Sequence, residues 1–158
     1  MPDQSSPVYP FGDLLALARQ SWLGAMTARL EERGYADYRR SDAAATRLLM
    51  GGPASIGRLG SRLGVTRQAA RKVADGLQRR GYAAASRDDN DSRQVNVVLT
   101  TAGQDYARAV VAVIAELNSE VARRADPASL EAADAVLRLV LFDESTRRRA
   151  EALPRPSP

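Results

Sequence analysis

The sequence predicts a mainly α-helical protein with one small β-hairpin. Apolar residues recur at helical spacing along most of the 158 residues, and they alternate with period two only between about residues 82 and 99. Glycines, prolines and helix-capping residues divide the helical pattern into separate segments. The hydrophobic content of 44% is enough for one core, so we expect a single domain over 11–148, with disordered ends at 1–10 and 149–158.

A long helix and a shorter one open this domain. The first is expected from about Phe11 to Arg33, where Gly34 can end it in a left-handed conformation. The second is expected from about Ser41 to Met50, with Ser41 as its N-cap, because the Gly-Gly-Pro sequence at 51–53 stops a helix.

Two short helices with a tight turn between them come next. Ser55 can cap the first of them, and Gly64 with Val65 forms the turn. Thr66 can cap the second, which ends at Gly81 and places an apolar residue at every fourth position, namely at Ala69, Val73 and Leu77. This arrangement predicts a helix-turn-helix.

The period-two region follows the helix-turn-helix directly. Tyr82–Ser86 is a short β-compatible segment, and Gln94–Leu99 alternates so that Val95, Val97 and Leu99 share one face. The polar segment Arg87–Arg93 separates the two strands. A hairpin with a charged tip in this place is a β-wing, and the module at 41–100 is therefore a winged helix-turn-helix.

Two helices complete the chain. Thr101 with Gln104 fits a capping box, although Thr100 can serve as the cap instead, and the helix runs to about Arg124. Asp126 and Pro127 open a last helix that ends near Arg148. The terminal helices, at 11–40 and 101–148, carry more apolar surface than a small winged module can cover, so we expect them to form the dimerisation region of a homodimer.

The composition argues against an enzyme and against a metal site. The chain has no cysteine and no histidine, which removes thiolate nucleophiles, imidazole bases and the commonest metal ligands. No nucleophile and base stand out as a pair, and no cofactor is expected. No apolar run is long enough for a membrane span and no signal peptide precedes the domain, so we expect a cytoplasmic protein without membrane contact.

The positive charge of the chain is concentrated in one segment. The stretch Arg58–Arg93 contains nine basic residues against four acidic ones, a balance of +5, whereas the remaining 14 basic and 15 acidic residues give −1. A localised excess of this kind is typical of a surface that contacts phosphate groups.

The helix that begins after Thr66 carries side chains expected to contact DNA, and Thr66 itself is expected to be a contact as well. Arg67, Gln68, Arg71 and Lys72 crowd its first two turns, opposite the apolar stripe. The start of the second helix of a helix-turn-helix enters the major groove, where Arg can bond guanine and Gln can bond adenine. Taken by itself, this helix also fits an ordinary solvated amphipathic helix.

The tip of the predicted wing is the second candidate contact. Arg93 can enter a narrow minor groove, whose negative potential attracts a guanidinium, and Asp91 can hold that side chain extended. Arg87 lies at the other end of the same loop. A polar hairpin with a surface salt bridge explains the tip equally well.

The wing and the residues after it resemble the signature of the MarR family. Asp91-Ser92-Arg93 runs into a strand that ends in Leu99-Thr100-Thr101-Ala102-Gly103, which is similar to the family's Asp-x-Arg followed by Leu-Thr-x-x-Gly. The order of elements over about 11–148 fits the family as well. The resemblance implies a winged helix dimer in which the Thr66 helix contacts the major groove and Arg93 the minor groove.

The resemblance also implies a small aromatic or phenolic effector. Trp22, Tyr35 and Tyr38 could stack against its ring, and Arg47 could pair with a carboxylate. Trp22 fits the role of a core or dimer anchor as well, and the tyrosines fit the boundary of the core.

We therefore expect a sequence-specific transcriptional regulator, a repressor that an aromatic ligand could release, binding an inverted repeat in double-stranded DNA as a homodimer. The alternative is a non-specific architectural DNA-binding protein, or a winged helix adaptor that binds other proteins.

Overall fold

The computed structural model describes residues 10–87 and 95–151, and the chain divides into two compact units, Met1–Arg40 and Ser41–Pro158. The first unit is built on helix α1 (Phe11–Glu32). Gly34 has a φ of +87°, and the backbone N–H groups of Gly34 and Tyr35 return to the carbonyls of Glu31 and Leu30. The predicted glycine stop is thus confirmed, one residue from the expected end of the helix.

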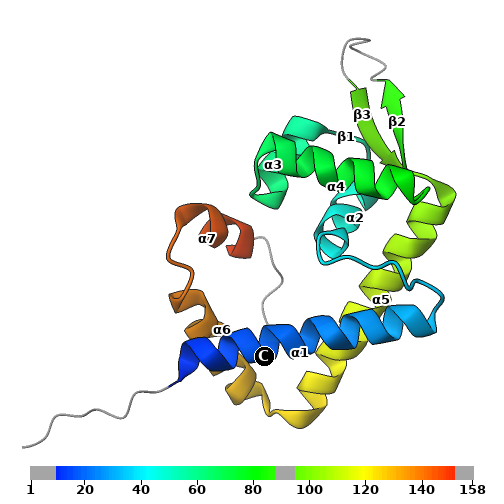
Figure 1. The fold of residues 1–158 in the computed structure, drawn as a ribbon. Helices are drawn as coiled ribbons and strands as arrows, with labels where there is room; N and C mark the ends of the chain where they lie inside the picture. Colours follow the sequence, from blue (N-terminus) through cyan, green and yellow to red (C-terminus); the bar gives the residue numbers. More distant parts are fainter. Residues whose placement is uncertain (1–9, 88–94, 152–158) are drawn as a thin grey trace, which may run out of the picture. The chain divides into compact units, whose positions relative to one another are not determined.

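The second unit contains the helix-turn-helix and the wing (Figure 1). In chain order it consists of α2 (Asp42–Met50), β1 (Ala54–Ser55), α3 (Ile56–Leu63), α4 (Arg67–Arg79), β2 (Ala83–Arg87), β3 (Val95–Leu99), α5 (Thr101–Arg124), α6 (Pro127–Leu139) and α7 (Glu144–Glu151). The mainly α fold with a small wing, predicted from the sequence, is confirmed. Among the described residues, no helix is long and apolar enough to cross a membrane.

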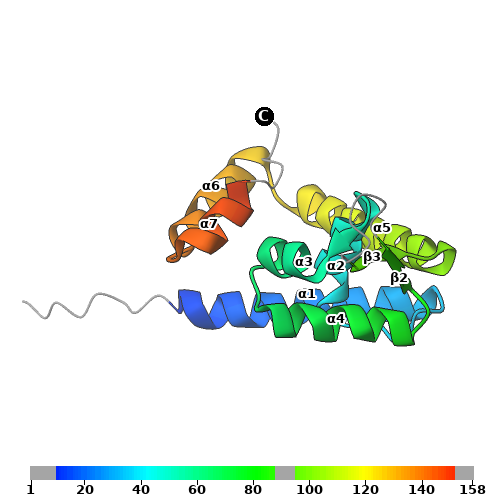
Figure 2. The same ribbon diagram turned by 90° about the horizontal axis from the view of Figure 1, so that it is seen from above.

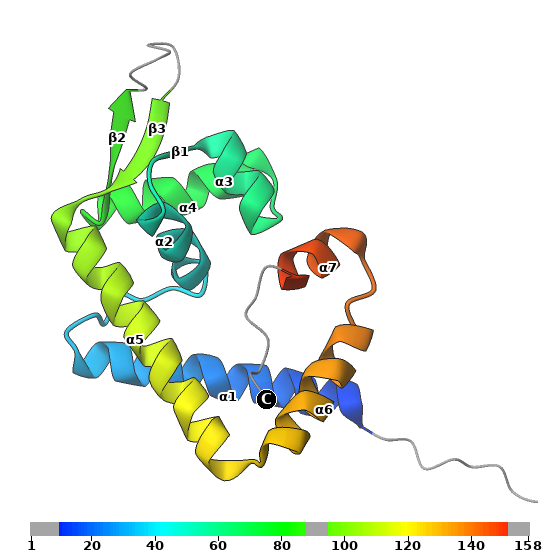
Figure 3. The same cartoon turned by 180° about the vertical axis from the view of Figure 1, so that it is seen from behind.

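Helices α3 and α4 lie side by side, as Figure 2 shows, and α2 packs against them and against α5 (Figure 3). The turn between α3 and α4 is set by Gly64, which has a φ of +66°. The core of the unit includes Leu59, Leu77, Val97 and Val110, none of which is more than 2% exposed. This core holds α4 between the helices and the sheet.

The sheet has three antiparallel strands in the order β1-β3-β2. Strand β1 was absent from the sequence prediction, because two residues have no periodicity of their own and are a strand only through pairing with β3. Ala54 and Ala85 both lie opposite Val97. Three apolar residues of β3 were predicted on one face. Val97 and Leu99 are buried, whereas Val95 near the tip is 55% exposed.

The buried face of α4 differs from the predicted stripe. Ala70, Ala74 and Leu77 are fully buried, whereas Ala69 and Val73 are only half-buried. A residue every fourth position drifts around a helix of 3.6 residues per turn, and a spacing of four and then three follows the core more closely. The correction rotates the exposed face of the helix by a fraction of a turn, and all four predicted DNA-contacting residues remain exposed on it.

Two helix boundaries also differ from the prediction. Ser41 does not cap α2, since its backbone is helical and its side chain makes no capping hydrogen bond. The expected last helix is two helices, α6 and α7, because Asp143 starts a new one by accepting a hydrogen bond from the backbone N–H of Thr146 at 2.8 Å. Thr100 caps α5, which decides between the two threonines considered.

Candidate nucleic-acid interface

Helix α4 begins with an N-cap hydrogen bond. The Oγ1 of Thr66 accepts a hydrogen bond from the backbone N–H of Ala69 at 3.2 Å, and Thr66 itself has an extended backbone. The side chain of Ser55 caps α3 in the same way, through the N–H of Arg58 at 3.2 Å. These caps fix where both helices start, and therefore which side chains occupy the first turns of α4.

The four predicted contact residues of α4 are exposed and lie in two rows. Arg67 and Arg71 line a cleft between α4 and the sheet. Gln68 and Lys72 are exposed but do not line this cleft. The prediction treated the four as one group, whereas the structure separates a row that faces the wing from a row that does not.

The cleft has a volume of about 610 Å³ and three walls. One wall is α4, the second is the wing sheet, and the third is the start of α3. Its lining consists of Ser55, Ile56, Gly57, Arg67, Arg71, Asp75, Gln78, Ala85, Val95 and Val97. The two guanidinium groups and the N-terminal end of a helix both favour an anion in this place.

Asp75 and Gln78 line the cleft but were absent from the sequence prediction. They continue the row of Arg67 and Arg71 at helical spacing, so the signal was present in the sequence. Asp75 is exposed and would repel a phosphate group, whereas Gln78 can donate and accept hydrogen bonds. The favourable end of the cleft for an anion is therefore the end that holds the two arginines.

The described part of the wing ends at the base of its tip. Arg87 is exposed at the end of β2, in register with Val95 of β3. The predicted wing pair, Asp91 and Arg93, lies outside the described residues. Both remain predictions.

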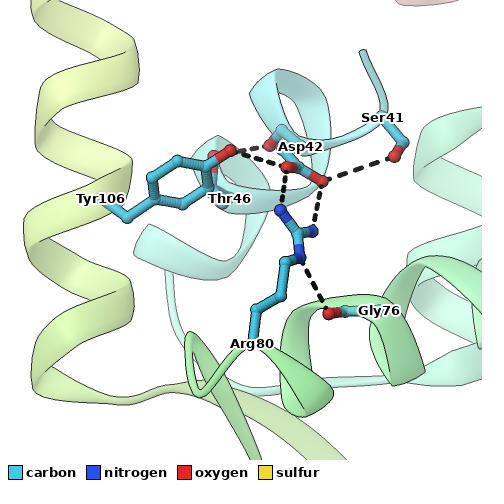
Figure 4. Close-up of polar contacts among 6 residues, drawn as sticks. All are labelled: Ser41, Asp42, Thr46, Gly76, Arg80 and Tyr106. Carbon is cyan, nitrogen blue, oxygen red and sulfur yellow. Dashed lines mark hydrogen bonds and ion pairs between the residues drawn. The ribbon is translucent and has the colours of Figure 1, made fainter. Parts of the chain in front are cut away.

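Arg80 belongs to the basic stretch of the sequence but not to the exposed interface. Its side chain is 13% exposed, and its guanidinium makes two hydrogen bonds to the carboxylate of Asp42, at 2.8 and 3.0 Å (Figure 4). Burial opposes its charge, but the hydrogen bonds and the charge of Asp42 outweigh burial and raise the pKa of Arg80. One of the nine basic residues is thus neutralised inside the protein.

Tyr106 completes this buried cluster. Its hydroxyl donates to Asp42 at 2.6 Å, and its ring stacks on Tyr82 with centroids 4.2 Å apart. Burial, and then the hydrogen bond and charge of Asp42, raise the pKa of Tyr106 far above its ordinary value. Sequence reasoning missed Asp42 and Tyr106, because each lies in a helix where only the local pattern was visible.

The predicted effector residues fall in different units. Trp22, Tyr35 and Tyr38 belong to the first unit, and Arg47 lies on α2 in the second. The Nε of Arg47 donates to the carbonyl of Ala43 at 3.1 Å, and the side chain is exposed. The structure does not test this group as a ligand site.

Comparison with known proteins gives three results. The model of the MarR family matches residues 47–94. A curated relative, the HTH-type transcriptional regulator YcgE of Bacillus subtilis, is 29% identical over 80 residues, and the match spans 51% of this chain and 52% of the relative. The chain thus matches about half the length of that relative.

Solved structures resemble the chain over more of its length. The complex of Staphylococcus aureus MepR with DNA has a TM-score of 0.72 at 17% identity, covering 84% of this chain and 97% of that one. Bordetella bronchiseptica BpsR, described with regulation of its DNA binding by 6-hydroxynicotinic acid, has a TM-score of 0.67 at 21% identity, covering 84% and 94%. These likenesses show the winged helix fold.

Proposed function

We propose that the chain is a DNA-binding transcriptional regulator of the winged helix MarR family, and that it represses transcription by binding an inverted-repeat operator as a homodimer. The observation that carries this proposal is the cleft between α4 and the wing, with Arg67 and Arg71 at one wall.

The cleft lies where a DNA backbone would pass. In a winged helix complex the second helix of the motif occupies the major groove, and a wing can enter the neighbouring minor groove. A phosphate strand separates those two grooves. It would therefore run between α4 and the wing, against Arg67 and Arg71, and Gln68 and Lys72 on the other row would face the groove.

This assignment gives the two rows different tasks. A side chain that neutralises phosphate contributes to the salt dependence of binding, whereas a side chain that bonds a base edge contributes to the preference for one sequence. Arg67 and Arg71 should act mainly in the first way and Gln68 in the second. Arg87 and the wing pair Asp91 and Arg93 would act at the minor groove.

The test is a selection followed by titration. The full-length protein is used to select an operator from a random duplex pool, and its affinity for that operator and for random DNA is measured across a range of salt concentrations. Arg71→Ala should reduce the salt slope by about 2 for a dimer, from about 0.9 for each lost phosphate contact. Gln68→Ala should keep the slope and lower the ratio of operator to random affinity.

The matched control is Arg108→Ala, which removes an equally charged side chain that is 61% exposed on α5. It should leave both quantities unchanged. Equal affinity of the wild-type protein for selected and random DNA would refute the proposed function and favour the architectural or adaptor alternative.

The dimer is supported by apolar surface that the second unit leaves exposed. Leu139 at the end of α6 is 75% exposed and Phe142 just after it 81%, and Val136 and Leu137 of α6 are exposed as well. Exposed apolar patches of this kind are typical of interfaces, and a two-fold dimer places two winged modules on an inverted repeat.

An aromatic effector is the finer part of the proposal. Trp22, Tyr35, Tyr38 and Arg47 are suited to an aromatic acid, and the DNA binding of BpsR is regulated by 6-hydroxynicotinic acid. A panel of aromatic acids, including that compound, should raise the unfolding temperature and release DNA, and Arg47→Ala should abolish both effects. A panel without any stabilising compound would contradict the sensor role.

A further inference from the structure

A buried ionic cluster joins three helices, one of which is α4, the proposed recognition helix. Asp42 lies in the first turn of α2, Arg80 caps the C-terminus of α4, and Tyr106 lies in the second turn of α5 (Figure 4). The side chains of Asp42 and Tyr106 are at most 1% exposed. None of the three can touch DNA, so any effect on DNA binding must act through the position of α4.

The hydrogen bonds of the cluster are directional. The carboxylate of Asp42 accepts two bonds from Arg80 and one from Tyr106, and the Nε of Arg80 donates to the carbonyl of Gly76 at 3.0 Å. A bidentate contact fixes the angle between its partners as well as their distance. Apolar packing alone would allow the last turn of α4 to slide and rotate.

The cluster extends to the base of the wing. Tyr82, which directly precedes β2, stacks on Tyr106, and the guanidinium of Arg80 lies 5.4 Å from the centre of the Tyr82 ring. The backbone N–H of Thr100 donates to the carbonyl of Tyr82 at 3.1 Å. The recognition helix and the wing therefore share one attachment point on the start of α5.

We propose that Asp42, Arg80 and Tyr106 are positioning residues that set the angle of α4 and the wing, and thereby the sequence specificity of DNA binding. The inference rests on the proposed function. Hydrogen bonds to base edges require alignment within tenths of an ångström, whereas attraction to phosphate acts over several ångströms. A loosened α4 should lose operator affinity and keep its affinity for random DNA.

Stability alone does not require this cluster. Replacing a buried ion pair by apolar residues of similar volume often leaves a protein as stable or makes it more stable, whereas removing one partner leaves an unpaired charge and is costly. The triple variant Asp42→Leu/Arg80→Met/Tyr106→Phe therefore separates the two roles. Tyr106 is included because its buried hydroxyl donates to Asp42, and removing only the acceptor would be costly in the same way. It removes the directional bonds and leaves no buried charge behind.

The experiment measures the affinity of the full-length protein for two DNAs, the operator selected by the wild type and random duplex DNA. It also measures thermal unfolding. The triple variant should unfold within a few degrees of the wild type and bind random DNA within about twofold. Its operator affinity should fall about tenfold or more, which corresponds to about one lost bidentate base contact. The salt slope should not change.

Two further variants complete the test. Tyr106→Phe keeps the stacked ring and loses one hydrogen bond, so its operator affinity should fall by about threefold to fivefold, the equivalent of one ordinary hydrogen bond. Asp105→Leu/Arg108→Met makes the same replacement in an exposed ion pair of α5 and should change nothing. A folded triple variant with the wild-type ratio of affinities would overturn the inference.

If the triple variant does not fold, the single variant Tyr106→Phe provides the test, and an unchanged ratio of operator to random affinity in that variant would also overturn the inference. A wild-type protein that does not distinguish operator from random DNA would instead refute the proposed function.

Discussion

Gly103, in the first turn of α5, should not tolerate any side chain. A Cβ atom at this position would lie 1.7 Å from the carbonyl oxygen of Tyr82 and 2.7 Å from its carbonyl carbon. Both are backbone atoms, so no change of rotamer relieves the collision. Gly103→Ala must therefore push the start of α5 away from the base of the wing by about 1.5 Å before ordinary contact distances return.

The cost of that movement follows from the contacts it breaks. The N–H of Thr100 donates to Tyr82 at 3.1 Å, the Oγ1 of Thr100 donates to Gly81 at 2.6 Å, and the N–H of Gly103 donates to that Oγ1 at 3.0 Å. The loss of two such bonds at about 1 kcal/mol each, with about 1–3 kcal/mol for overpacking, destabilises by about 3–5 kcal/mol. The unfolding temperature should fall by about 6 to 20 °C.

The assay is thermal unfolding by circular dichroism, with Gly76→Ala as the matched control. Gly76 lies inside α4, and a Cβ atom there meets nothing within 4 Å. That variant should gain about 0.5–1 kcal/mol, because glycine inside a helix costs about this amount relative to alanine. Equal unfolding temperatures for Gly103→Ala and the wild type would refute the reasoning.

Three further predictions address the cap, the buried tyrosine and the dimer. Thr66→Ala should cost about 1 kcal/mol in urea unfolding because it removes the N-cap of α4, whereas Thr101→Ala, one residue after the cap of α5, should cost much less. The raised pKa of Tyr106 means that its contribution to stability is complete below about pH 10, the pKa of an unfolded tyrosine, and is lost as the pH rises above it. In the native protein below about pH 11, Tyr106 should therefore stay protonated and contribute no tyrosinate absorbance, so Tyr106→Phe should show the same absorbance as the wild type. A lower absorbance in Tyr106→Phe would contradict the raised pKa. If the protein forms the proposed dimer, Leu139→Asp should convert it to a monomer in light scattering, whereas Val65→Asp, at a residue 43% exposed in the helix-turn-helix, should remain dimeric. A dimeric Leu139→Asp would place the interface elsewhere.

The sequence predicted the features that local chemistry determines. Thr66 and Ser55 start their helices, and Gly64 forms the turn, because a cap or a left-handed glycine acts on the few residues beside it. The split between α6 and α7 was predictable in the same way. Asp143 accepts hydrogen bonds from Ser145 and Thr146, which also lowers the pKa of its carboxyl. A single helix was predicted here because the apolar residues keep helical spacing across Asp143.

The features that were missed depend on partners far apart in the chain. Arg80 is 38 residues from Asp42, and Tyr106 is 64 residues from it. No periodicity indicates such a contact, since each residue looks ordinary in its own helix. Strand β1 was missed for the same reason, because only its pairing with β3 makes it a strand.

Arg80 shows why a count of charges along the sequence is an incomplete guide to a DNA-binding surface. It contributes to the balance of +5 in Arg58–Arg93, yet its charge is matched by Asp42 from outside that stretch. The absence of this charge from the surface should cost little affinity, since phosphate attraction would be shared among several exposed side chains. In the positioning role that we propose, the pair gives α4 a fixed geometry, and a phosphate-contacting surface without it should bind DNA with little preference for sequence.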